Sequence, residues 1–127
     1  MPKVQPTDQF SLYTNCRKDS WFWVYLWPNL AIMRRKNPEG GMRGKHAFTL
    51  PNENKIGKLG EVHFALSSFT IPVISHELNH AVFEVMRLNS IDPKDWDGEE
   101  YHCEIQQFML EQVCHRYNIN QVHKLIS

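Results

Sequence analysis

The hydrophobic periodicity of the chain changes once, at Ser67 and Ser68, and this change limits the folds that the chain can adopt. Before it, apolar residues alternate with polar ones or form short unbroken runs, as they do in β-strands. After it, apolar residues recur every three or four positions, as they do on one face of an α-helix. The sequence therefore predicts strands first and helices last, which is the order of an α+β domain.

Four segments before the change are strand candidates. Trp21–Trp27 is aromatic and β-branched with two apolar faces, which predicts a strand covered on both sides. Leu30–Met33 is expected to continue that strand after a turn or to form the next one. Lys45–Leu50 is a weaker candidate, and Gly60–Leu66 alternates cleanly, which predicts a half-exposed strand. We expect these strands to form a small, mostly antiparallel sheet.

Two helices are predicted after the change. The first begins after Thr70, which is placed to cap it, and its apolar stripe continues to about Asn89. A loop rich in Asp and Gly follows, and Glu99 to about Tyr117 has the spacing of a second helix.

Length and charge exclude several classes of protein. The chain has 127 residues, enough for one compact domain, which we expect to span residues 1–127. Fourteen Lys and Arg balance fourteen Asp and Glu, so no global basic field attracts nucleic acid or an anionic membrane. No run of about 18 apolar residues is available to span a bilayer. We therefore expect neither nucleic acid nor a membrane as a partner.

The cysteines and the N-terminal segment predict a reduced, cytoplasmic protein. Three Cys is an odd number, and Cys103 and Cys114 lie too far apart along one predicted helix to form a disulfide. The first ten residues lack the apolar core of a signal peptide.

The first predicted helix contains the pattern HExxH, formed by His76, Glu77 and His80. Residues four apart lie on one face of a helix, so both imidazoles can reach a single Zn²⁺ at about 2.0–2.1 Å. Glu77 is then placed to contact a water molecule beside the ion. The alternative is a solvated polar face, but the pattern falls in the middle of a helix with a regular apolar stripe. We therefore predict a zinc site here.

A catalytic zinc site needs a third protein ligand, and Glu100 is the predicted one. It follows His80 by twenty residues, which allows the first helix to end and a second helix to return. Glu99 and His102 are the alternative ligands. Cys103 is expected to be a small buried residue that lets the two helices approach closely.

The strand Gly60–Leu66 leads directly into the helix that carries the motif. We therefore expect the edge of this strand to lie beside the zinc site. A free strand edge there would pair with an extended peptide by strand addition.

These features resemble the core of the zincin metallopeptidases, of the gluzincin kind in which Glu is the third ligand. The segment from Gly60 through His76–Ala81 to Glu99–Glu100 is similar to small, single-domain metallopeptidases encoded by tailed bacteriophages and prophages. The resemblance covers about residues 60–113. Here Gly98–Glu99–Glu100 replaces the acidic pair that is common at the start of the last helix, and Cys103 occupies the small position.

The resemblance implies a zincin-like domain that hydrolyses peptide bonds of a peptide or protein substrate. Glu77 would act as the general base, with His76, His80 and Glu100 holding the Zn²⁺. A second donor would stabilise the developing oxyanion or contact the substrate; the candidates are Tyr101, His102, His115, Tyr117 and His63.

A second function remains open from the sequence. The chain would be a catalytically silent module that keeps the zincin shape and binds a host or virion protein. The intact Glu77 favours the peptidase, because a module without chemistry has no need of a base between the two His.

Overall fold

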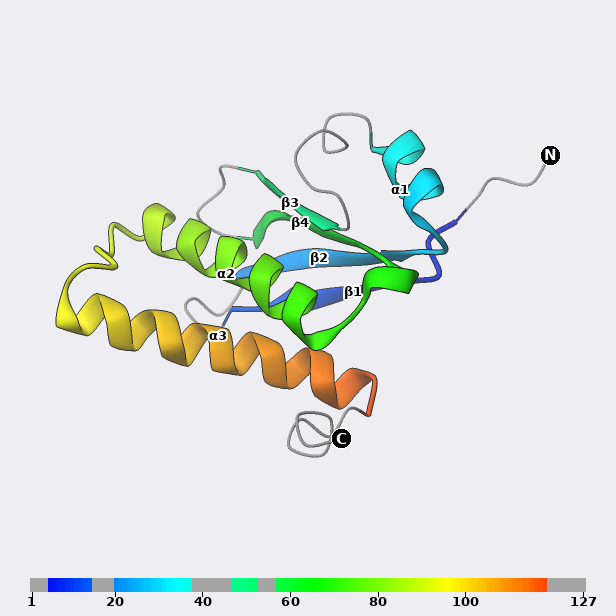
Figure 1. Ribbon diagram of the computed structural model, residues 1–127. Helices are drawn as coiled ribbons and strands as arrows, with labels where there is room; N and C mark the ends of the chain where they lie inside the picture. The colour runs from blue at the N-terminus through cyan, green and yellow to red at the C-terminus, as the bar shows by residue number, and fades with distance from the viewer. Residues whose placement is uncertain (1–4, 15–19, 38–46, 53–56, 119–127) are drawn as a thin grey trace.

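The computed structural model describes residues 5–14, 20–37, 47–52 and 57–118 and shows an α+β fold with one mixed sheet (Figure 1). The elements in chain order are β1 (Asp8–Tyr13), β2 (Ser20–Trp27), α1 (Leu30–Lys36), β3 (Ala47–Pro51), β4 (Gly57–Ala65), the 3₁₀ turn η1 (Leu66–Ser68), α2 (Ile71–Leu88) and α3 (Trp96–Arg116).

The four strands lie in the order β1-β2-β4-β3. β1 pairs with β2 and β3 pairs with β4 in antiparallel fashion, whereas the central pair, β2 and β4, is parallel. Two of the three strand pairs are thus antiparallel, as expected for a mostly antiparallel sheet, and the parallel central pair makes the sheet mixed. A parallel pair needs a crossover connection, and here the crossover contains α1 and β3.

The alternation of β2 divides its side chains between two cores. Phe22, Val24 and Leu26 face the main core, where they pack with residues of α2 and α3. Trp27 belongs to a smaller cluster on the other face, which Met33 of α1 helps to close. The predicted two-sided covering is thus complete at the Trp27 end, while Trp21, Trp23 and Tyr25 are half-buried.

Leu30–Met33 is helical, and the prediction of a strand there was wrong. The side chain of Asn29 accepts a hydrogen bond from the backbone N–H of Ile32, which caps the first turn of α1. The periodicity of these four apolar residues is compatible with a strand or a helix, and the N-cap at Asn29 favours the helix.

The two later strand predictions locate β3 and β4 with shifted boundaries. β3 begins at Ala47, and Lys45 and His46 lie outside the described residues. β4 begins at Gly57 and ends at Ala65, so Leu66 lies in η1 and is exposed. β1 was not predicted, because its six residues alternate too weakly to indicate a strand.

The expectation that the strand before the motif helix forms a free edge was also wrong. β4 is paired on both sides, with β2 and β3. The edge next to α2 is instead β3, which has β4 as its single neighbour among the described strands.

α2 and α3 cover one face of the sheet side by side (Figure 1). α2 extends over the predicted range and buries six members of its apolar stripe: Ile74, Leu78, Ala81, Val82, Val85 and Met86. Thr70 occupies the N-cap position without a side-chain capping bond, and α3 begins three residues before its predicted start.

None of the described helices is both long enough and apolar enough to cross a membrane.

Cys103 is exposed, so the expectation that it is a small buried residue between the two helices was wrong. The close contact at the start of α3 is instead between Gly98 and the preceding loop. A Cβ atom on Gly98 would lie 1.8 Å from the carbonyl oxygen of Asp92. The loop can therefore fold onto the first turn of α3 because Gly98 has no side chain. Cys103 and Cys114 are not joined in a disulfide, in keeping with their positions on one helix.

The C-terminal half of α3 is joined to β1 by polar side chains. Gln112 accepts a hydrogen bond from the Tyr13 backbone N–H at 3.0 Å and donates one to the Tyr13 carbonyl oxygen at 2.7 Å. Arg116 donates two hydrogen bonds to the carboxylate of Asp8, at 3.0 and 2.8 Å, and lies over the ring of Phe10. The hydrogen bonds from Arg116 lower the pKa of Asp8 to about 2.

We predict that Asp8→Asn destabilises the protein by about 1 kcal/mol at neutral pH, allowing for solvent screening of a partly exposed pair. The pKa of Asp8 in the folded state, about 2, is below its ordinary value of 3.8, so the ionised carboxylate favours folding. Its contribution is complete above about pH 5 and is lost as the pH falls through 4 toward 2. Urea unfolding of both proteins across this range measures the difference, and a constant difference at all pH values would contradict the prediction.

Candidate metal centre

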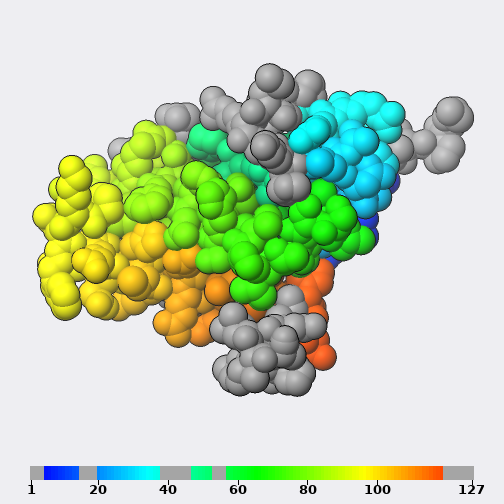
Figure 2. Space-filling model, in the orientation of Figure 1, coloured from blue at the N-terminus to red at the C-terminus, as the bar shows by residue number. Residues whose placement is uncertain are grey.

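The HExxH residues lie together on α2. His76 and His80 are one helical turn apart and both are exposed, whereas Glu77 is 6 % exposed. This contrast follows from the rotation of the helix: Leu78 and Ala81 face the core, so the side chains of His76 and His80 reach solvent while Glu77 lies at the boundary of the core. In the space-filling view, α2 forms a continuous band at the surface above α3 (Figure 2).

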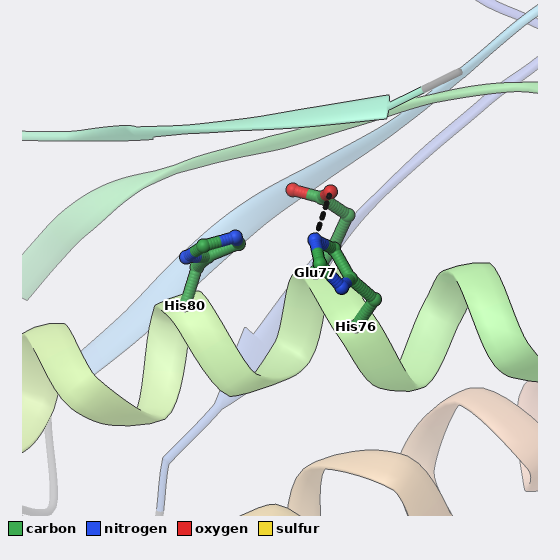
Figure 3. A group of neighbouring side chains, drawn as sticks. All are labelled: His76, Glu77 and His80. Carbon is green, nitrogen blue, oxygen red and sulfur yellow. Dashed lines mark ion pairs between the residues drawn. The ribbon is translucent and has the colours of Figure 1, made fainter. Parts of the chain in front are cut away.

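The three side chains form one compact group. Their potential ligand atoms all lie within 4.8 Å of one another, and the imidazole centroids of His76 and His80 are 5.0 Å apart. The Nε2 atom of His76 lies 3.9 Å from Oε2 of Glu77, as marked in Figure 3. All three side chains extend from the same side of α2, toward the sheet (Figure 3).

Thr49 of β3 holds the carboxylate of Glu77. The Thr49 hydroxyl donates a hydrogen bond to Oε1 of Glu77 at 2.9 Å and lies 3.4 Å from the Glu77 backbone oxygen. Thr49 is therefore a site residue that the sequence analysis missed. Alternation along Lys45–Leu50 could separate its two faces, but nothing in the sequence indicated that β3 would pack against α2.

The donor set fits a transition-metal ion such as Zn²⁺. Imidazole nitrogens and carboxylate oxygens are typical zinc ligands, and two donors bound at about 2.0–2.2 Å lie within about 4.4 Å of each other. The 3.9 Å between His76 and Glu77 is within this limit, and small side-chain rotations suffice for a group that spans 4.8 Å. The group could therefore hold a metal ion.

The structure does not bring Glu100 into this group. α3 packs against the other side of α2, where Gln106 donates to the hydroxyl and backbone oxygens of Ser75. His102 also faces α2, with its ring 4.8 Å from that of Phe83. Glu100 is two residues before His102, about 200° around the helix, and is exposed. The expectation from the sequence that Glu100 is the third ligand is untested by this geometry, and the Glu100→Gln substitution below tests it.

The other two alternatives differ in their surroundings. Glu99 is exposed in the first turn of α3. His102 is half-buried, and its Nε2 atom is buried without a hydrogen-bond partner among the described residues. His102 also contacts α2, through the ring of Phe83.

The candidate oxyanion donors on α3 are not gathered at the group. Tyr101 and His115 are exposed. The hydroxyl of Tyr117 donates to Asp8 at 2.7 Å, which places it at the β1 edge of the sheet, whereas Glu77 lies at the β3 edge. Burial and the Asp8 carboxylate raise the pKa of Tyr117, so its hydroxyl stays protonated and keeps this bond.

His63 is a structural residue on the opposite face of the sheet from α2. It is 1 % exposed and stacks between Tyr25 and Phe48, its neighbours on the adjacent strands, with both ring centroids at 4.6 Å. Its Nδ1 accepts a hydrogen bond from the indole N–H of Trp27, and its Nε2 lies 2.8 Å from Glu61. The expected contact of His63 with substrate is therefore not supported by its position.

Glu61 completes this second polar cluster. Burial alone would raise its pKa, but hydrogen bonds from Lys58 and His63 outweigh burial and lower the pKa. The Nζ atom of Lys58 is 2.6 Å from Oε2 of Glu61, which leaves the other carboxylate oxygen for His63.

No family model, curated protein or solved structure matches the chain.

We predict that Glu100→Gln leaves the Zn²⁺ affinity unchanged, because the carboxylate is exposed and lies on the side of α3 away from α2. Isothermal titration with Zn²⁺ measures the effect, with Glu104→Gln as a control on the same exposed surface. A loss of more than about 10-fold for Glu100→Gln alone would restore Glu100 as a ligand.

Proposed function

We propose that the protein is a zinc-dependent metallopeptidase in which His76 and His80 bind the ion and Glu77 is the general base. The observation that carries this proposal is the arrangement of the group. Two exposed imidazoles stand side by side, and the carboxylate between them and β3 is buried and held by a hydrogen bond. A solvated polar face would leave Glu77 exposed and free to rotate.

Hydrolysis of a peptide bond by metal-activated water requires a general base that lies close to the ion and can accept a proton from the water. Bound Zn²⁺ supplies Lewis acidity, which makes water a nucleophile near neutral pH. Oε2 of Glu77 faces His76 and can accept the proton of the attacking water, while Oε1 is occupied by Thr49. Glu77 would then pass that proton to the leaving nitrogen of the cleaved peptide.

The β3 edge supplies a place for an extended substrate. β3 is paired on one side, by β4, among the described strands, and its Thr49 contacts the proposed base. An extended peptide added to this edge would run past Glu77 and form backbone hydrogen bonds that do not depend on its sequence. This arrangement favours a peptide or an unfolded protein segment as the substrate.

A non-catalytic binding module with a zincin-like shape is the second candidate. One observation favours it: the group contains no third ligand from the described part of α3. In that case the β3 edge would bind a partner protein, and the metal would be structural or would not bind.

We predict that the purified protein binds one Zn²⁺ and that His80→Ala weakens binding by more than about 100-fold. Loss of a direct ligand should exceed the 10- to 100-fold that outer partners contribute. Metal analysis after dialysis and competition with a chromophoric chelator measure this. A wild-type protein that retains no stoichiometric Zn²⁺ would overturn the proposed function.

We predict that Glu77→Gln keeps the Zn²⁺ but lowers peptide cleavage by about 10²- to 10⁴-fold, because the amide cannot act as a base. Cleavage of a proteome-derived peptide library, followed by mass spectrometry, presents many sequences at once and so measures activity on an undefined substrate. Glu111→Gln, an exposed change on α3, is the matched control. Equal cleavage products from Glu77→Gln and wild type would instead favour the binding module.

A further inference from the structure

We propose that Thr49 is a positioning residue that keeps the carboxylate of Glu77 from binding the metal. This inference rests on the proposed function and deepens it. Beside a metal ion the carboxylate of Glu77 can be either a ligand or a general base, and the hydrogen bond from Thr49 on β3 favours the base.

Glu77 is close enough to its neighbours to be a ligand. Its carboxylate belongs to the group whose ligand atoms lie within 4.8 Å of one another, and Oε2 is 3.9 Å from the Nε2 of His76. A carboxylate bound to Zn²⁺ has given its lone pair to the ion and is a weaker base. A glutamate that serves as the base must therefore be restrained from turning further toward the ion.

Thr49 supplies this restraint. Its hydroxyl donates a hydrogen bond to Oε1 of Glu77 at 2.9 Å, whereas the other carboxylate oxygen, Oε2, is the one that lies 3.9 Å from Nε2 of His76. One oxygen is thus tied to the sheet and the other faces the imidazoles. A hydrogen bond to a charged, buried group is strong enough to select one side-chain orientation.

The position of Thr49 itself is well determined. It pairs with Val62 in the middle of the β3–β4 ladder, and its neighbours Ala47 and Phe48 are buried in the two separate cores. The hydroxyl is therefore carried by a regular strand that is packed on both faces, which is the kind of support that holds a functional side chain in place.

Metal binding alone tests the inference. Thr49→Val keeps the branched shape suited to a strand but removes the hydroxyl, whereas Thr49→Ser keeps the hydroxyl. In Thr49→Val the released carboxylate should bind the metal as an added direct ligand, so the visible absorption of the Co²⁺-substituted protein should shift and Zn²⁺ affinity should rise by at least about tenfold. Thr49→Ser should match the wild type in both measurements.

A double-mutant comparison shows whether Thr49 acts through Glu77. In a Glu77→Ala background, Thr49→Val should change neither the Co²⁺ spectrum nor the Zn²⁺ affinity, because no carboxylate remains to be released. Circular dichroism and thermal unfolding of each variant establish that it is folded, and Thr49→Ala serves as a second hydroxyl-free variant.

The outcomes separate the two proposals. A Thr49→Val protein with the wild-type spectrum and affinity, with weaker Zn²⁺ binding, or with a shift that persists in Glu77→Ala would overturn the role of Thr49 and leave the zinc site in place. A wild-type protein that takes up neither Co²⁺ nor Zn²⁺ would overturn the proposed function, and the role of Thr49 with it.

Discussion

The burial of the α2 stripe against the sheet is the constraint on which the candidate site depends. Ile74, Leu78, Ala81 and Val85 are fully buried, so the helix has one rotational setting. In that setting His76 and His80 reach the surface and Glu77 lies at the boundary between core and solvent. A rotation of about 100° would bury a histidine without a partner, at a cost of several kcal/mol. The hydrophobic core thus determines which polar atoms meet.

The sheet order then determines what Glu77 meets. The parallel pairing of β2 with β4 sends the chain across the sheet and returns β3 to the outer side of β4. β3 consequently lies against α2, and Thr49 reaches the carboxylate of Glu77. On the opposite face, the same strands stack Tyr25, His63 and Phe48 in register. Two histidine-containing clusters therefore occupy opposite faces: one is closed by aromatic rings and the other is open at the surface.

The sequence predicted the parts of this structure that depend on local periodicity. The range of α2, the shared face of His76 and His80, and the presence of β2, β4 and α3 all follow from apolar spacing. The errors concern tertiary relations. A short apolar segment such as Leu30–Met33 fits a strand or a helix, and the Asn29 cap decides. The interior position of β4 cannot be read from spacing, because it depends on which strands pair. Thr49 was missed for a similar reason.

Among the described residues, the two edge strands of the sheet differ in the side chains that contact them. At the β1 edge, Gln112 bonds both backbone groups of Tyr13, and Arg116 and Tyr117 bind Asp8. α3 thus blocks strand addition where no candidate chemistry lies. At the β3 edge no described strand pairs beyond β4, yet Thr49 and Glu77 lie beside it. An unprotected edge invites aggregation, so proteins normally cover it. An extended chain bound at β3, as proposed, would therefore lie beside a buried carboxylate and two exposed imidazoles.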